Sequence, residues 1–109
     1  MNWTIVYYSA KVKAEIDDLP AGIHASLLRL YNFLILHGVN LRLPHSRAMG
    51  NGLFELRPKG KEGIGRVFYC TQVSAKIVIL HSFIKKTQET PARELEVARK
   101  RLKEVRHES

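Results

Sequence analysis

The spacing of hydrophobic residues changes several times along the chain, and its first half predicts one strand followed by two helices. Residues 2–8, "NWTIVYY", are rich in aromatic and β-branched side chains, which is typical of a strand. In residues 10–19 apolar side chains recur at i, i+4 and i+7, which predicts a short amphipathic helix with Ser9 as its N-cap. Residues 21–37 repeat this period with more apolar positions, and Gly38 supplies a helix stop. We expect this second helix to be the main packing partner of a sheet.

The middle of the chain alternates with the period of strands. Residues 39–50 have no sustained period and are interpreted as a loop. The segments "GLFELR", "IGRVFYCTQV" and "KIVILHSFIK" then predict three strands, with "PKGKEG" as a hairpin connection and a tight turn near Ser74–Ala75. Because these segments follow one another closely, we expect an antiparallel meander.

The segment "TPARELEVARKRLKEV" predicts a last helix, with Thr90 as N-cap and Pro91 at the first helical position. Its apolar face consists of Leu95, Ala98, Leu102 and Val105. The predicted order is therefore β-α-α-β-β-β-α, which indicates a single α+β domain over residues 1–109. In this fold a helical hairpin covers one face of a twisted antiparallel meander, and the C-terminal helix leaves the other face open or partly covered.

Strand alternation predicts that several charged side chains share that second face. The residues expected to meet the helical hairpin are Phe54, Leu56, Val67, Leu80 and Ile84. The residues then expected together on the opposite face are Glu55, Arg57, Arg66, His81 and Lys85. Lys59, Lys61 and Lys86 reach its rim.

The charge of the chain fits such a surface. Eighteen Lys and Arg against ten Asp and Glu give a formal net charge of +8, which predicts attraction to RNA, DNA, an acidic protein or a membrane surface. A cationic cleft suits a phosphodiester backbone, and Phe68 and Phe83 are candidates to stack on unpaired bases.

Each of these residues also has a structural interpretation. The loop lysines can be ordinary solvated turn charges, and the strand-end lysines can extend their ammonium groups to solvent. Arg66 can form a structural ion pair with Glu55, because an unpaired guanidinium inside an apolar strand is costly. His81, amid apolar neighbours, can be a core histidine.

Other residue types exclude some functions. Cys70 is the single cysteine, so an internal disulfide and a cysteine-based zinc site are excluded. The remaining histidines lack metal-ligand spacing, and we expect neither a metal site nor a cofactor. The first ten residues do not resemble a signal peptide, and no stretch approaches the ~20 apolar residues that span a bilayer. We expect a cytoplasmic protein without a membrane role.

Three segments together resemble a known family. "GLFELR", "GRVFYC" and "ILHSFIKKTQETP" followed by "ELEVARKR" are similar to the RelE/ParE toxin superfamily, and most to its HigB-like, phage-derived branch. The resemblance covers residues 51–101. It implies a RelE-like fold and a type II toxin–antitoxin toxin that cleaves mRNA without a metal, usually on the translating ribosome. The implied partners are mRNA, the ribosome and a HigA-like antitoxin with a helix-turn-helix domain.

The resemblance also implies site residues. The strand arginine of the family falls on Arg66, the basic residue ending the preceding strand falls on Arg57, and the basic residues after the last strand fall on Lys85 and Lys86. The terminal tyrosine of some RelE-type members is absent.

We expect Arg66 to clamp a phosphate and Arg57 to help bind it. Lys85 would stabilise the phosphorane or transfer a proton, and Glu55 and His81 are candidates to activate the 2′-hydroxyl. Two alternatives stay open: a ParE-like gyrase inhibitor, and a non-catalytic RNA- or ribosome-binding protein.

Overall fold

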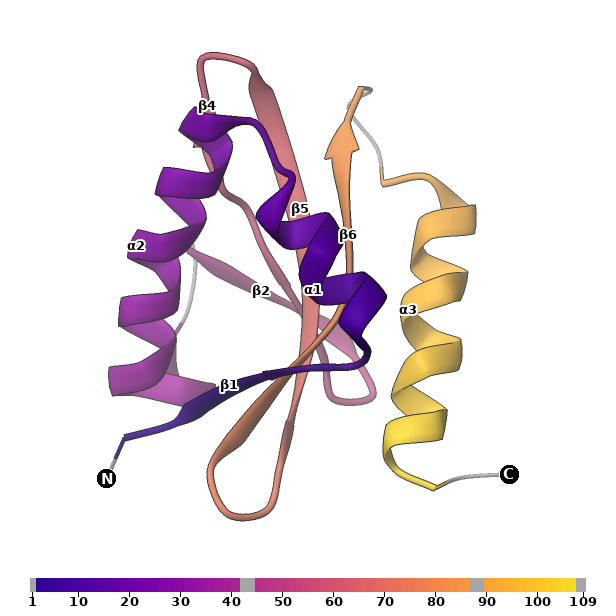
Figure 1. The fold of residues 1–109 in the computed structure, drawn as a ribbon. Helices are drawn as coiled ribbons and strands as arrows, with labels where there is room; N and C mark the ends of the chain where they lie inside the picture. Colours follow the sequence, from indigo (N-terminus) through magenta and orange to yellow (C-terminus); the bar gives the residue numbers. More distant parts are fainter. Residues whose placement is uncertain (1, 42–44, 87–89, 108–109) are drawn as a thin grey trace.

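The computed structural model describes residues 2–41, 45–86 and 90–107 (Figure 1). The elements in chain order are β1 (Thr4–Tyr7), α1 (Ala10–Asp17), α2 (Ala21–His37), the 3-10 turn η1 (Gly38–Asn40), β2 (Ser46–Gly50), β3 (Leu53–Leu56), β4 (Lys59–Gly60), β5 (Gly63–Gln72), β6 (Lys76–Lys85) and α3 (Ala92–Val105). Within these residues three α-helices pack on one six-stranded sheet. The predicted α+β class is confirmed.

The sheet has the strand order β1-β6-β5-β3-β2, with β4 paired to β5 beside this path. All neighbours are antiparallel except β1 and β6, which run parallel. The predicted order of seven elements is wrong at two places. The supposed loop 39–50 contains β2, and the supposed hairpin connection contains β4. Both strands are too short and polar to show a period of their own, and their pairing partners define them.

Most predicted helix boundaries match the local chemistry of the chain. The Ser9 hydroxyl accepts a hydrogen bond from the Val12 amide and caps α1. Gly38 ends α2 with a positive φ of 52°, a conformation that suits glycine. The prediction for α3 is wrong by one residue: Pro91 is the N-cap, and the Thr90 hydroxyl donates to Glu55 instead.

Helices lie on both faces of the sheet (Figure 1), and each face has its own hydrophobic cluster. Helices α1 and α2 pack on one face, where Leu56, Val67 and Phe54 meet them as predicted. Helix α3 packs on the other face through Ala98 and Leu102. Among the described helices, none is by itself long and apolar enough to cross a membrane.

Leu80 was predicted on the face of α1 and α2, and this is wrong. The register between β5 and β6 shifts after Phe68, so that Phe68 pairs with His81 while Tyr69 pairs with Ile79. The extra residue, Leu80, joins the cluster beneath α3. A bulge of this kind cannot be located from alternation alone, because it breaks the alternation. The tight turn predicted near Ser74–Ala75 is present, and both residues have positive φ.

Candidate functional site

A buried carboxylate organises the face of the sheet that α3 leaves uncovered. Glu55 lies one residue before Leu56, which packs toward α1 and α2, so its own side chain points to the α3 face. The Glu55 side chain is only 1% exposed. Its Oε1 lies 3.3 Å from Arg57 Nε and 3.5 Å from Arg66 Nε, and its Oε2 accepts a hydrogen bond of 3.3 Å from Thr90 Oγ1. The carboxylate therefore ties β3, β5 and the start of α3 together.

Arg66 lies on the same face, across from Phe83 of β6. Its side chain is 6% exposed, and its Nη1 donates to the Gly65 carbonyl at 3.0 Å. Burial lowers the pKa of its guanidinium, Glu55 opposes this effect, and the neighbouring Arg57 adds to it. The structural ion pair with Glu55, one of the two interpretations of Arg66, is present.

Lys85 is the last residue of β6 and is partly exposed. Its pKa is lowered, first by desolvation and then by the positive charge of Arg66; Glu55 raises it, and Arg57 and Arg47 lower it further. A lysine with a lowered pKa transfers its proton more readily near neutral pH than an ordinary lysine does. We call the four basic residues around Glu55 the cation cluster; they are Arg47, Arg57, Arg66 and Lys85.

Arg47 was not predicted as a site residue. It lies in β2 directly opposite Glu55, and its side chain is exposed. The preceding Ser46 is buried and its hydroxyl lies 2.6 Å from that of Tyr69, which fixes the strand. The signal that would have revealed β2 is the Asn-Gly pair at 51–52, a strong hairpin turn sequence directly before the "LFEL" strand.

His81 is on the α3 face, but its ring is engaged by α3. Its Nε2 lies 2.9 Å from a Glu94 carboxylate oxygen, and its Nδ1 lies 3.5 Å from Arg101 Nη1. Its ring also stacks on Phe83, with a centroid distance of 6.2 Å. The structure therefore links His81 to α3 rather than to Glu55.

Of the two aromatic side chains expected to stack on bases, Phe68 is buried and Phe83 is partly exposed. Phe68 is fully buried among the side chains under α3, so the expectation that it stacks on bases is wrong, because no face of its ring is exposed. Phe83 is partly buried against the same cluster. Its ring lies 6.0 Å from that of Phe68. Of these two rings, that of Phe83 is the one partly exposed to solvent.

The predicted rim lysines are exposed. Lys61 and Lys86 lie at the surface, and Lys59 lines a pocket of about 360 Å³ between β4 and α2. Arg57 lines the same pocket and connects it to the cation cluster. The other lining residues are Ser26, Arg29, Leu30, Phe33 and His45. Among the described residues no group of three His, Cys, Asp or Glu side chains is placed to hold a metal ion.

The chemistry of this arrangement is that of an anion site. One nearly buried carboxylate pairs with Arg57 and Arg66, Arg47 lies opposite it in β2, and the charges of this group act on the pKa of Lys85. In comparisons with known proteins, the family model described as phage derived protein Gp49-like matches residues 14–103. A search of the curated proteins finds no significant match.

Proposed function

Because the chain belongs to the family of phage-derived Gp49-like proteins, a RelE/HigB-like toxin family, we propose that it is an endoribonuclease toxin of a type II toxin–antitoxin module. Its substrate is mRNA, cut on the translating ribosome in the cytoplasm, as in the HigB-like branch. The observation that carries the proposal is the cation cluster around Glu55. The proposed reaction needs no metal ion, because side-chain cations supply the positive charge.

The reaction needs positive charge where the phosphate gains negative charge. The 2′-hydroxyl of one nucleotide gives its proton to solvent water as its oxygen bonds to the adjacent phosphorus, and the bond from phosphorus to the 5′-oxygen breaks. The products are a 2′,3′-cyclic phosphate and a 5′-hydroxyl. Charge grows on the non-bridging oxygens in the transition state, so fixed guanidinium groups stabilise that state more than the substrate.

The exposure of each cation assigns its role in this proposal. Arg57 is 30% exposed and Arg47 is exposed, so both are open to contact the phosphate directly. Arg66 was expected to clamp the phosphate, but its side chain is 6% exposed, so in this proposal it contributes a fixed positive charge from beneath. Lys85, with its lowered pKa, protonates the leaving 5′-oxygen.

Glu55 and His81 are the candidates to activate the 2′-hydroxyl, and both have partners within the protein. Glu55 has both oxygens engaged and is 1% exposed, and His81 is held by Glu94. We therefore assign Glu55 to positioning the guanidinium groups. If the ribosome holds the 2′-oxygen in line with phosphorus, orientation supplies much of the acceleration without a strong base.

The test compares the two lysines at the ends of β6. Lys85→Ala should lower the rate of mRNA cleavage on translating ribosomes by about 10²–10³-fold, because it removes the proton donor. Lys76→Ala, at the exposed first position of the same strand and away from the cation cluster, should leave the rate near wild type. Cleavage is read by primer extension, and growth arrest follows it in cells. Equal cleavage by both variants and by Arg57→Ala would defeat the nuclease assignment.

A second function, RNA or ribosome binding without cleavage, is favoured by one observation. The Glu55–Arg66 pair is nearly buried. An arginine held in such a pair can have a structural role in the sheet instead of a catalytic one. The same ribosome experiment separates the two functions, since binding alone leaves full-length message. A gyrase-directed activity, the ParE-like alternative, would appear as loss of supercoiling by purified gyrase.

The family membership also implies an antitoxin partner. We propose a HigA-like protein with a helix-turn-helix domain and an acidic contact surface. Because the toxin carries a net charge of +8, added salt should slow association more than it speeds dissociation. The exposed apolar side chains of α2, Leu28 and Phe33, are candidates for its apolar contacts.

A further inference from the structure

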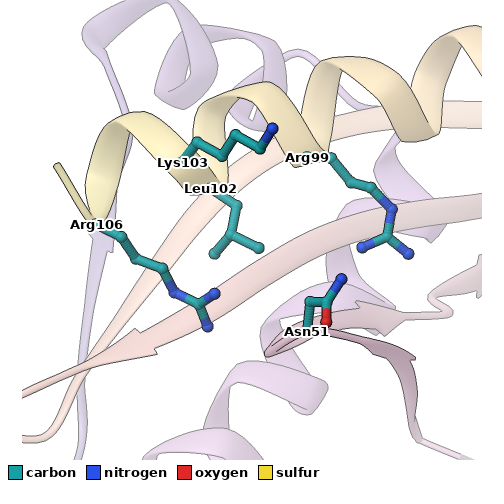
Figure 2. A pocket seen from close by; sticks show the side chains of 5 residues that line it. All are labelled: Asn51, Arg99, Leu102, Lys103 and Arg106. Carbon is teal, nitrogen blue, oxygen red and sulfur yellow. The ribbon is translucent and has the colours of Figure 1, made fainter. Parts of the chain in front are cut away.

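A second cationic site lies between α3 and the turn that joins β2 to β3. It is a pocket of about 420 Å³, lined by Asn51, Arg99, Leu102, Lys103 and Arg106. Figure 2 shows Arg99 and Arg106 reaching from α3 on either side of Leu102 toward the turn that carries Asn51. We call this the α3 pocket.

The helical period explains why the cations gather here. Positions 99, 103 and 106 follow one another at i, i+4 and i+7 and therefore share one face of α3. Two acids of the helix have partners elsewhere: Glu94 pairs with His81, and Glu104 accepts a hydrogen bond from Tyr8. None of the five lining residues is acidic, so the three positive charges of the pocket are not neutralised within it.

Two of the cations are already held in place. Arg99 donates to the carbonyl of Met49 at 2.8 Å and to that of Gly50 at 3.4 Å, which fixes α3 against the end of β2. The Arg106 guanidinium occupies the space that a side chain at position 52 would fill, which is open because that residue is Gly52. Because these side chains are already ordered, less side-chain conformational entropy is lost when a ligand binds here.

Strand β2 joins this pocket to the cation cluster. Arg47 of β2 lies opposite Glu55, and the Met49 carbonyl two residues later binds Arg99. Arg47 and Asn51 are four residues apart, a distance of at most about 13 Å for an extended chain. A chain with regularly spaced negative charges can span both sites along β2.

The chemistry of the α3 pocket favours a nucleic acid over a protein. Protein interfaces depend on buried apolar anchors, and the apolar lining here is Leu102, which is 3% exposed. The large exposed apolar side chains on a helix are on α2 instead: Leu28, Phe33 and Leu36. We propose that the α3 pocket binds the phosphodiester backbone of RNA, at phosphates away from the scissile one. This rests on the proposed function in assuming that RNA is the substrate.

The experiment measures how RNA affinity depends on salt. The full chain is titrated against two probes: a single-stranded oligonucleotide with 2′-O-methyl groups, which cannot be cleaved by 2′-oxygen attack, and message-free ribosomal subunits. The test variant is Lys103→Gln with Arg106→Gln. The control is Arg93→Gln with Lys100→Gln, which removes two exposed charges of the same helix outside the pocket.

The two double variants should differ in how steeply RNA affinity falls as salt is added. Each lost phosphate contact reduces the slope of log affinity against log salt by about 0.7 for a single strand, so the test variant should lose about 1.4. The control should change the slope much less. Loss with the oligonucleotide identifies message phosphates, and loss only with the subunits identifies ribosomal RNA.

Equal slopes for both variants on both probes would overturn the inference. The result does not depend on cleavage, because neither probe needs to be cut. If wild-type protein fails to cleave message while the test variant still loses slope, the proposed nuclease function fails and the α3 pocket stands as an RNA site. If cleavage is normal and the slopes are unchanged, the proposed nuclease function stands and the α3 pocket is not an RNA site.

Discussion

Glu55 shows how one residue can hold the site together. Its buried carboxylate receives two guanidinium groups and one hydroxyl from three different elements. Carboxylates are costly to bury, and this one is stable because its partners carry positive charge. The same contacts set the positions of Arg57 and Arg66 before any ligand arrives.

Glu55→Gln should lower the free energy of unfolding by about 1–3 kcal/mol, because Arg66 loses its charged partner while it stays nearly buried. The measurement is the urea midpoint at constant m-value. Asp17→Asn breaks an exposed pair with Lys13 and should move the midpoint much less. Equal midpoints for the two variants would show that Glu55 has no stabilising role.

Lys85 should be visible in the pH dependence of cleavage. Its pKa is lowered by desolvation first and by Arg66 second, so the proton donor is lost at a lower pH than for an ordinary lysine. The rate should then fall as pH rises through this lowered pKa. Lys85→Arg keeps its proton and should move the falling limb to higher pH, measured by single-turnover cleavage. An unmoved limb would mean that Lys85 is not the donor.

At the scale of elements, the short strand β4 and its loop fasten the sheet to α2. The Lys59 amide donates to Ser26 Oγ at 3.1 Å, and the Gly22 amide donates to Glu62 Oε2 at 3.0 Å. The second contact places a carboxylate at the N-terminal end of a helix, where the helix dipole favours negative charge. The rim that carries Lys59 and Lys61 is therefore anchored.

Gly60 is needed for this close approach. A Cβ at this position would lie 2.5 Å from the Ile23 amide nitrogen and 2.6 Å from the Gly22 carbonyl carbon. Gly60→Ala should therefore destabilise the fold by about 1–3 kcal/mol, since backbone has to move. Thermal unfolding measures it, with Gly50→Ala as control, where a Cβ meets no atom within 4 Å and only the positive φ is strained. A Gly60→Ala variant as stable as wild type would contradict the packing.

Glu62 predicts a pH-dependent contribution. Hydrogen bonding to the Gly22 amide lowers the pKa of its carboxyl below the ordinary value. A carboxyl whose pKa is lowered on folding stabilises the protein above its unfolded pKa, and this contribution disappears as pH falls through the folded pKa. The melting temperature of Glu62→Gln should thus lie below wild type at neutral pH and converge with it in acid. A constant difference would rule out this linkage.

At the scale of the whole molecule, the sheet separates two kinds of surface. The face toward α3 carries the cation cluster and the α3 pocket, and α2 carries the exposed apolar side chains. The net charge of +8 attracts polyanions to the whole molecule. The two surfaces meet at the pocket that Arg57 and Phe33 both line, so a partner bound to α2 would reach the edge of the cation cluster.

Cys70 reports on the integrity of the whole fold. Its thiol is fully buried beneath α3, and burial raises its pKa. Since the thiolate is the reactive form, a thiol reagent should label the native protein only through unfolding. Labelling rates should rise with denaturant in parallel with loss of the circular dichroism signal. Rapid labelling without denaturant would show that α3 leaves the sheet readily.

The spacing of residues along the chain was sufficient for the local features. Helix α2 has the predicted bounds, Ser9 caps α1, and the turn at Ser74–Ala75 is where its sequence places it. Alternation also placed Glu55, Arg57 and Arg66 on one face, because strand geometry is a property of consecutive residues.

Pairing between distant segments decided the rest. Arg47 joins the site because β2 pairs with β3, Thr90 turns to Glu55 instead of capping α3, and a bulge moves Leu80 across the sheet. The α3 pocket exists because a helix from the end of the chain lies over a turn from its middle. Periodicity determines which way a side chain points from its own element. The neighbour that it meets depends on how the elements pack, which is stabilised by contacts far apart in sequence and leaves no local pattern.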